Sequence, residues 1–395
     1  MTGIPLNGLL PLPIWGYPLA ALALTHITIV AVTIYLHRHQ AHRAVELGFI
    51  PAHFLRAWLW FTTGMNTKEW TAIHRKHHAF VEQLEDPHSP QVRGLNKVLW
   101  EGVELYRVES LNPETIKKFG HGTPNDWLER NVYGVHRNVG ISLMLFVNVL
   151  LFGPLGLTIW AVQMAWIPFF AAGVINGMGH SIGYRNFESP DASTNIFPWG
   201  LLIGGEELHN NHHAFASSAK FSAKWWELDL GWIYIRVLET LSLAKVKKIA
   251  PRLYRRTGKH GVDLDTVRAV IDNRLQVMAD YARTVVSTVH REEIQKAVGN
   301  TRELLKSSRR LLHRETSLLD DEARRRLEAA LRQSRALRDV YRFRLRLQAI
   351  WMERTATQEV LLEALQEWCL EAQQSGVAAL VEFAGDIRGY SLQRP

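Results

Sequence analysis

The chain has a single cysteine, Cys369, among its 395 residues. An intramolecular disulfide, a cysteine-rich zinc site and an iron–sulfur cluster held by thiolates each need at least two cysteines. All three are therefore excluded, and a metal bound by this chain must use nitrogen or oxygen ligands. Histidine is the abundant ligand type, with 18 copies. Most of them lie between His26 and His213.

Charged side chains are missing from Thr2 to Leu36, a stretch that ends directly at the first histidine cluster. Its last 22 residues, 15–36, are enough for one helix across a hydrocarbon core of roughly 30 Å. A cleaved signal peptide is the alternative interpretation, but a positively charged n-region and a small-residue cleavage site are both missing. The segment therefore predicts a retained transmembrane helix.

Two further uncharged segments, 139–153 and 155–177, meet at the turn signal Gly153-Pro154 and predict a membrane hairpin. Residues 49–65 are apolar and aromatic but contain two polar interruptions, so we expect a helix that lies at the membrane interface. The formal net charge is +8, and the basic residues lie between the spans and in 184–256 rather than at the N-terminus. This positive-inside bias places the N-terminus outside and every histidine cluster on the cytoplasmic side.

Long uncharged runs are absent after residue 250, where arginine, glutamate and leucine dominate. We therefore expect a first domain at 1–255 and a second, cytoplasmic one at 262–385. Leucines at helical spacing predict that the second consists of two to four amphipathic helices in a coiled-hairpin arrangement. The consecutive arginines at 324–326 are interpreted as a solvated helix face. Because the sequence has no zinc finger, RNP-like strand or phosphate-cradling glycine loop, we expect no nucleic-acid partner.

Three histidine clusters point to metal chemistry. They comprise His37 and His42; His74, His77 and His78; and His209, His212 and His213. Residues three and four apart share a helix face, so each of the last two clusters can aim several imidazoles at one point. Imidazole suits zinc, copper, iron and nickel, but eight histidines are too many for one tetrahedral zinc. Asn176 and His180, at i and i+4, are further candidates.

The other histidines of this half have structural interpretations. His26 and His53 stand alone in apolar segments, where a packed and hydrogen-bonded histidine is commoner than a metal ligand. His88, His121 and His136 are interpreted as loop or surface residues.

In order and spacing, these motifs resemble those of the membrane fatty acyl desaturases. The match is closest to the stearoyl-CoA (Δ9) type, in a bacterial acyl-CoA or acyl-lipid branch. It includes Glu69-Trp70 before the second cluster, DPHSP at 86–90, N-x3-H at 176–180, GYRNF at 183–187 and GEELHNNHH at 205–213. The resemblance covers about residues 15–250. It implies an all-α, membrane-embedded domain with a cytoplasmic diiron cap, followed here by a helical extension that the animal enzymes lack.

The resemblance also implies two iron ions held by nine histidines, with a tenth position filled by Asn176 through a water molecule. The nine are His37, His42, His74, His77, His78, His180, His209, His212 and His213. His39, inside the first cluster, matches no ligand of the family. Trp70 matches an aromatic residue beside the acyl chain. Thr25 and Ile29 fall where the family closes the end of its substrate tunnel.

The implied reaction uses dioxygen as co-substrate and removes two hydrogens from a saturated acyl chain, carried by CoA or by phospholipid. Its product is a cis double bond at Δ9, made in unsaturated fatty acid biosynthesis. Nothing in the chain resembles a haem, flavin or iron–sulfur site, so electrons must come from an external reductase with a ferredoxin or a cytochrome-type donor. We expect a multi-pass protein of a bacterial inner membrane. Its C-terminal helices are expected to self-associate, to contact the membrane surface or to dock the electron donor.

Two alternatives remain. A membrane hydroxylase or alkane monooxygenase uses related histidine motifs, but the GYRNF and GEELHNNHH segments favour the desaturase. A non-enzymatic metal transporter or haem-binding membrane protein needs polar residues along its spans. The spans of this chain are nearly free of them.

Overall fold

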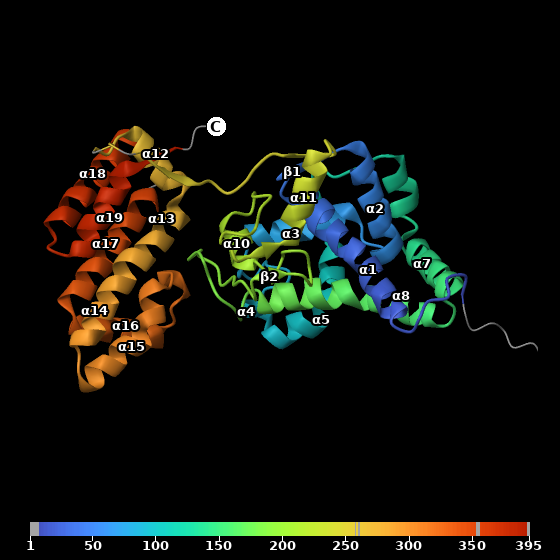
Figure 1. The fold of residues 1–395 in the computed structure, drawn as a ribbon, viewed down its shortest axis with the longest axis horizontal. Coiled ribbons are helices and arrows are strands. Elements are labelled where there is room, and N and C mark those ends of the chain that lie inside the picture. Colours follow the sequence, from blue (N-terminus) through green and yellow to red (C-terminus); the bar gives the residue numbers. More distant parts are fainter. Residues whose placement is uncertain (1–7, 257, 260, 353–355, 393–395) are drawn as a thin grey trace, which may run out of the picture. The chain divides into compact units, whose positions relative to one another are not determined.

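Helices make up most of the protein. The computed structural model describes residues 8–256, 258–259, 261–352 and 356–392 (Figure 1). Its strands are only two or three residues long and form three two-stranded sheets. The prediction of an all-α fold is confirmed.

Two compact units divide the chain, each with a hydrophobic core of its own. The N-terminal unit comprises the described residues up to Arg185 together with Asp191–Ala250. The C-terminal unit comprises Asn186–Pro190 and the described residues from Pro251 onwards.

The first helix of the N-terminal unit is longer than predicted. It begins as α1 (Gly16–Val30) and continues without a break into the π-helical segment η1 (Ala31–Ala41). Together they span 26 residues, which is long and apolar enough to cross a membrane. The helix therefore runs past the predicted boundary at residue 36 and includes His37. Its last bond joins the N–H of His42 to the carbonyl oxygen of His37, at 3.1 Å.

A helical hairpin forms where the sequence predicts one. Its elements are α7 (Arg137–Phe152), α8 (Leu155–Ile167), η3 (Pro168–Ile175) and α9 (Asn176–Met178). Of the described helices, Gly16–Ala41 and Leu155–Met178 are long and apolar enough to cross a membrane. α7 is apolar, but its 16 residues are fewer than the roughly 20 that a full span needs. Only two of the three predicted spans thus reach full length.

The Pro-rich segment 4–14 lies in part outside the described residues, which begin at Gly8. The N–H groups of Leu9 and Leu10 bond to the carbonyl oxygens of Leu150 and Leu151, at 3.0 and 2.7 Å. The described part of the segment therefore lies against the end of α7.

A sharp turn sets the start of the helix that carries the second histidine cluster. α2 (Phe49–Thr63), where an interfacial helix is predicted, leaves Phe49 78% exposed and ends at Gly64, whose φ is +62°. Asn66 then caps α3 (Thr67–Ala79), because its side-chain oxygen accepts from the N–H groups of Lys68 and Glu69 at 3.0 and 3.1 Å.

The remaining helices and strands complete the N-terminal unit. They are β1 (Val45–Leu47), α4 (Pro90–Arg93), α5 (Leu95–Ser110), α6 (Pro113–Phe119), η2 (Glu129–Tyr133), β2 (Trp199–Gly200), α10 (His209–Ala214), β3 (Leu228–Asp229), α11 (Leu230–Thr240) and β4 (Ala244–Val246). β1 pairs antiparallel with β4, and β2 pairs parallel with β3. α5 crosses η3 closely, since a Cβ on Gly102 would lie 2.5 Å from the carbonyl oxygen of Ala172. Glycine is therefore needed at this crossing.

The C-terminal unit is a helical bundle. Its elements are β5 (Leu253–Arg255), α12 (Leu264–Asp272), α13 (Arg274–Tyr281), η4 (Ala282–Val286), α14 (Ser287–Lys296), α15 (Gly299–His313), η5 (Thr316–Leu318), α16 (Asp321–Gln333), α17 (Arg335–Met352), α18 (Gln358–Gln374), α19 (Ala378–Gly389) and β6 (Tyr390–Leu392). The described residues thus form more helices than the two to four that the leucine spacing predicts. β5 pairs antiparallel with β6, which closes the unit where the chain enters it.

Aromatic rings and buried polar bonds hold this bundle together. Trp368 is 1% exposed and packs against Tyr281, Phe343 and Phe383, with ring centroids 5.5 to 6.3 Å away. Its Nε1–H donates to the carbonyl oxygen of Phe343 at 2.9 Å. Arg344, also buried, donates to three carbonyl oxygens at the end of α15.

We predict that Trp368→Ala lowers the free energy of unfolding of the C-terminal unit by about 3–5 kcal/mol, because it leaves a cavity in the middle of the core. Urea unfolding of a fragment beginning at Pro251, followed by circular dichroism, measures the change. Leu370, on the same helix but 54% exposed, is the matched control. Equal losses for Trp368→Ala and Leu370→Ala would contradict this packing.

Candidate metal centre

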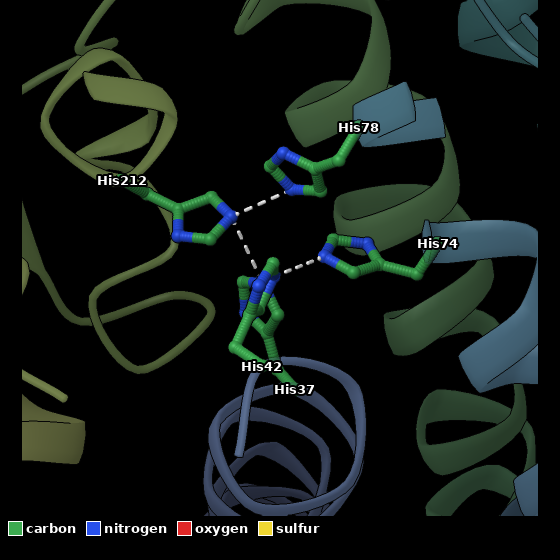
Figure 2. Close-up of side chains that lie close together, drawn as sticks. All are labelled: His37, His42, His74, His78 and His212. Atoms are coloured by element: carbon green, nitrogen blue, oxygen red, sulfur yellow. Dashed lines mark hydrogen bonds between the residues drawn. The ribbon is translucent and has the colours of Figure 1, made fainter. Parts of the chain in front are cut away.

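Five histidines from three parts of the chain converge in the N-terminal unit. His37, His42, His74, His78 and His212 each offer a nitrogen atom, and these atoms all lie within 4.8 Å of one another (Figure 2). The Nε2 atom of His212 approaches those of His78 and His37 to 2.9 and 3.1 Å, and His42 and His74 approach to 2.8 Å. We call this set the five-histidine group.

Four further histidines form a second set beside the first. His77, His180, His209 and His213 offer nitrogen atoms within 4.8 Å of one another. The Nε2 atoms of His180 and His209 are 3.0 Å apart, and those of His77 and His213 are 3.4 Å apart. We call this set the four-histidine group. All nine histidines that the sequence singled out are thus brought together, in two sets that share no residue.

The spacing of these nitrogen atoms fits a metal coordination shell. Two nitrogen ligands about 2.1 Å from one cation, at right angles to each other, are roughly 3 Å apart. The five Nε2–Nε2 pairs given above are 2.8 to 3.4 Å apart. A purely structural histidine instead points its nitrogen atoms at carbonyl, hydroxyl or carboxylate groups, as His26 does with the hydroxyl of Tyr234 at 2.7 Å. The donor set present therefore fits two metal ions.

The π-helical winding of η1 explains how His37 and His42 meet. In an α-helix of 3.6 residues per turn, residues five apart point in directions about 140° apart. A π-helix bonds residue i to residue i+5, which places the two on nearly one face. The observed N–H to carbonyl bond between His42 and His37 is of this kind. Their ring centroids are consequently 4.9 Å apart.

The two asparagines inside the third cluster orient α10. The side-chain N–H of Asn211 donates to Glu227 at 2.9 Å, and the Asn211 backbone N–H donates to the side chain of Asn195 at 3.1 Å. Asn210 donates to the hydroxyl of Ser193 at 3.3 Å. These bonds fix the short helix that carries the three histidines of the third cluster.

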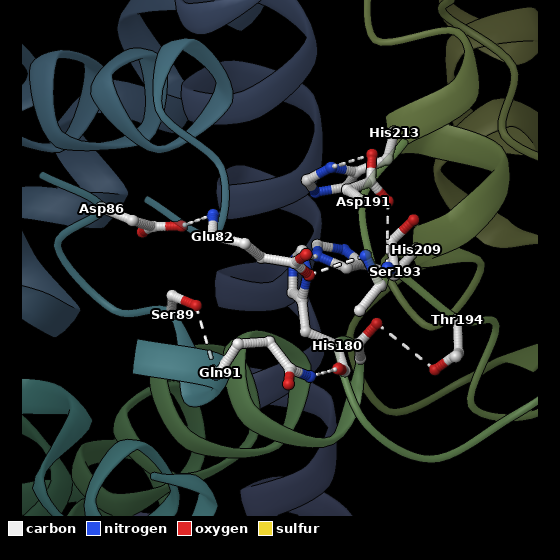
Figure 3. Close-up of polar contacts among 12 residues, drawn as sticks. Glu82, Asp86, Ser89, Gln91, His180, Asp191, Ser193, Thr194, His209 and His213 are labelled. Carbon is white, nitrogen blue, oxygen red and sulfur yellow. Dashed lines mark hydrogen bonds and ion pairs between the residues drawn. The ribbon is translucent and has the colours of Figure 1, made fainter. Parts of the chain in front are cut away.

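Carboxylates hold the second nitrogen atom of four histidines. Nδ1 of His77 contacts both oxygens of Asp86 at 3.0 Å. Nδ1 of His180 contacts Glu82 at 3.2 Å (Figure 3). Nδ1 of His37 lies 2.5 Å from Glu206, and that of His213 lies 3.6 Å from Asp191. Where the acidic group is ionised, it keeps the proton on Nδ1 and leaves the Nε2 lone pair free for a cation.

Two acidic side chains of this shell, Glu206 and Asp86, have shifted pKa values. Burial raises the pKa of Glu206 to about 8. For Asp86, burial acts against ionisation, but the facing His77 ring and its hydrogen bond hold the pKa of Asp86 well below its usual value. Glu82 supports the same shell, at a φ of +61°, in the left-handed region that residues other than glycine rarely adopt.

Burial favours the neutral form of five of these imidazoles. Desolvation lowers the pKa of His74, His78, His209 and His212 well below the usual value for histidine. For His213, desolvation outweighs the opposing effect of Asp191 and lowers the pKa to about 4. Neutral imidazole is the form that binds metal ions, so burial prepares the site for a cation.

A buried ion pair beneath the histidines joins the first and third clusters. Arg38 is 0% exposed, and its Nη2 donates to Asp229 at 2.8 Å. Its guanidinium lies 3.8 Å from the ring centroid of Phe221. That ring in turn packs against His37 and His212, with centroids 5.4 and 4.7 Å away. The pair thus supports two histidines of the five-histidine group.

His88 corrects a prediction from the sequence. It was expected in a loop or at the surface, but it is 7% exposed and stacks on His77 with ring centroids 4.4 Å apart. Its N–H donates to Asp86 at 3.1 Å, and its buried Nε2 atom has no partner among the described residues. The turn made by Asp86-Pro87 folds this residue back under α3, which the local sequence does not reveal. His121 and His136 are exposed, as expected.

A mainly apolar cavity of ≈ 490 Å³ adjoins both groups. His37, His74 and His209 form part of its wall, together with side chains of α3, α5, α8 and η3. This volume is within the usual range for a site that holds a small apolar molecule. The cavity gives such a molecule access to the histidines.

The remaining predicted site residues differ in their relation to the cavity. Trp70 lines it and stacks on His74, with ring centroids 4.9 Å apart, and Asn176 lines it as well. Thr25 and Ile29 are buried in α1 and are not among its lining residues. His39 lies outside both groups, and its Nδ1 is 3.0 Å from the carbonyl oxygen of Val45.

The four carboxylates and His88 were not assigned a role from the sequence. The available signal was an acidic residue close to the second and third clusters: Glu82 and Asp86 follow the second cluster, and Glu206 precedes the third. Acidic residues are common in any solvent-exposed segment. This signal alone therefore does not distinguish a carboxylate that contacts a histidine from one that is exposed to solvent.

Two family models match the chain. One, described as "Fatty acid desaturase", matches residues 12–240. The other, described as "Transposase", matches residues 277–392, within the C-terminal unit.

Among curated proteins, "Delta-9 desaturase-like 4 protein" of Arabidopsis thaliana is 30% identical over 242 residues, which are 59% of this chain and 77% of the relative. "Delta-9 acyl-lipid desaturase 1" of the same plant is 29% identical over 61% of this chain and 78% of the relative. "sn-1 stearoyl-lipid 9-desaturase" of Anabaena variabilis is 29% identical over 56% of this chain and 79% of the relative.

We predict that Asp86→Asn lowers the metal affinity of the four-histidine group about 10- to 100-fold, because it removes the carboxylate that holds the His77 ring. Metal content per protein after dialysis, measured by mass spectrometry, reports the change. Asp126→Asn is the control, since Asp126 is 43% exposed and pairs with Arg56. Metal content unaffected by Asp86→Asn would show that this carboxylate does not support a bound ion.

Proposed function

Because the chain belongs to the fatty acid desaturase family, we propose that it introduces a cis double bond at Δ9 into a saturated acyl chain, carried by CoA or by a phospholipid. The observation that carries this proposal is the mainly apolar cavity whose wall includes His37, His74 and His209. An acyl chain is a ligand of matching character, and in this cavity its methylenes reach both histidine groups. The names of the three relatives reported above support Δ9 as the position.

The nine histidines would hold two iron ions, with Asn176 acting through a water molecule. With dioxygen and two external electrons, bound iron supplies the oxidising power that an unactivated alkyl C–H bond requires and that no side chain possesses. The five-histidine and four-histidine groups would each take one ion. The histidine clusters are able to bind metal, which supports this assignment.

The residues around the ions have separate tasks in this proposal. Asp86, Glu82, Glu206 and Asp191 keep four imidazoles oriented through Nδ1. Trp70, stacked on His74, would press the acyl chain against the cavity wall beside the ions. The apolar lining excludes water, which protects the reacting carbon atoms from side reactions.

Electrons would come from a reductase with a ferredoxin or a cytochrome-type donor. The basic segments between the spans favour a multi-pass arrangement with the centre on the cytoplasmic side of a bacterial inner membrane. The C-terminal unit would then face the same compartment and serve for self-association or for docking of the donor.

We predict that cells expressing the chain gain a Δ9 monoene, measured by gas chromatography and mass spectrometry of total fatty acids. His78→Ala should abolish the gain while the protein still accumulates in the membrane, because the five-histidine group loses a ligand. His39→Ala is the matched control, with a much smaller effect, since His39 contacts a backbone carbonyl outside both groups.

New hydroxy acids or alcohols without a monoene would contradict the desaturase and favour the hydroxylase. An unchanged monoene level in His78→Ala would remove that residue from the metal shell. Altered metal uptake with unchanged lipids would favour a transporter.

A further inference from the structure

One wall of the cavity is a single helical face. The rod formed by α8, η3 and α9 contributes lining residues at 163–164, 167–168, 171–172 and 175–176. This spacing of about four residues is that of one side of a helix. Asn176 lies at the end nearest the histidines, four residues before His180. Gln163 is 13 residues earlier, or roughly 20 Å along the rod at 1.5 Å per residue.

Gln163 is a polar exception at the far end of this face. It is 3% exposed, and its Oε1 atom has no hydrogen-bond partner among the described residues. Its Nε2 reaches only the carbonyl oxygen of Ile159, at 3.5 Å. An amide without partners in an apolar setting is costly, and inside a membrane helix such a residue usually has a function.

The same end of the cavity is otherwise apolar. Among the cavity-lining residues of the first helix, Val32 lies farthest from the histidines, five residues before His37. Ile167 and Ile203 line the cavity as well, and both are buried. Thr25 and Ile29, which lie further along α1, do not line it. The boundary of the cavity is therefore near Val32 and Gln163.

We propose that the Gln163 amide is the floor of the acyl site and sets the length of chain that the protein accepts. This inference rests on the proposed function, because it requires an acyl chain in the cavity. A terminal methyl group cannot hydrogen-bond to the amide, so a further methylene would have to press against an unpaired polar group. A longer acyl chain gains no binding free energy beyond this point. The preferred acyl chain therefore ends just before the Gln163 amide.

The hairpin provides a matched control. Asn148, on α7, is also 3% exposed and carries a buried side-chain nitrogen without a partner among the described residues. It does not line the cavity. A change at Asn148 therefore tests the loss of a buried amide in the same hairpin without altering the floor.

The experiment compares monoene chain lengths in cells that express the wild type, Gln163→Ala, Gln163→Phe or Asn148→Ala. Gas chromatography and mass spectrometry give the ratio of longer to shorter monoenes, which does not depend on expression level. Gln163→Ala deepens the floor and should raise the ratio about fourfold for each methylene that gains contact. Gln163→Phe should lower it, and Asn148→Ala should leave it unchanged.

An unchanged ratio in an active Gln163→Ala protein would overturn the inference and leave the desaturase intact. Absence of monoene from the wild type would instead overturn the proposed function. If the Gln163 variants are inactive, a binding measurement replaces the activity measurement. It records how much saturated acyl chains of increasing length raise the melting temperature of the purified, metal-loaded proteins. The acyl-chain length that stabilises the protein most should be longer for Gln163→Ala than for the wild type. An unchanged optimal length would reject Gln163 as the floor.

Discussion

Nine imidazoles can share one buried region only if they are neutral and if their Nε2 atoms face one another. Burial provides the first condition for seven of the rings, because a charged imidazole would lose its hydration. Carboxylates at Nδ1 provide the second for four of the rings, since they fix the tautomer and the ring direction. In the absence of a cation, facing lone pairs give little stability. The scaffold of ion pairs and hydrogen bonds around the histidines must therefore hold them in place by itself.

The need to hold the histidines in place explains several buried polar contacts of the N-terminal unit. The Arg38–Asp229 pair is buried beneath Phe221 and joins helix η1 to the loops around α10. The side chains of Asn210 and Asn211 bond α10 to Ser193 and Glu227. Such buried polar networks cost free energy unless every member is satisfied, but they specify one arrangement of the groups they join. The α-helical hairpin and the α5–η3 crossing then place an apolar cavity next to that arrangement.

The sequence predicted the parts of this design that follow from local pattern. Helical spacing brought His74, His77 and His78 to one face, and hydropathy located the long helices. It could not reveal the π-helical winding that unites His37 with His42, because backbone winding has no simple residue code. It also missed the burial of His88, which depends on a turn folding under a distant helix. Thr25 and Ile29, placed at the cavity end by resemblance, lie outside a cavity whose depth is set by packing between helices.

The continuity of α1 with η1 has a consequence for the bilayer. The apolar rod that would cross the membrane also carries His37 and ends directly before His42, with no hinge between the two roles. The height of the metal centre above the hydrocarbon region is thus tied to the thickness of that region. Double bonds thin and loosen a bilayer, so the product of the reaction would alter the tilt of the rod that positions the reaction. The membrane would then act as the mechanical support of the centre.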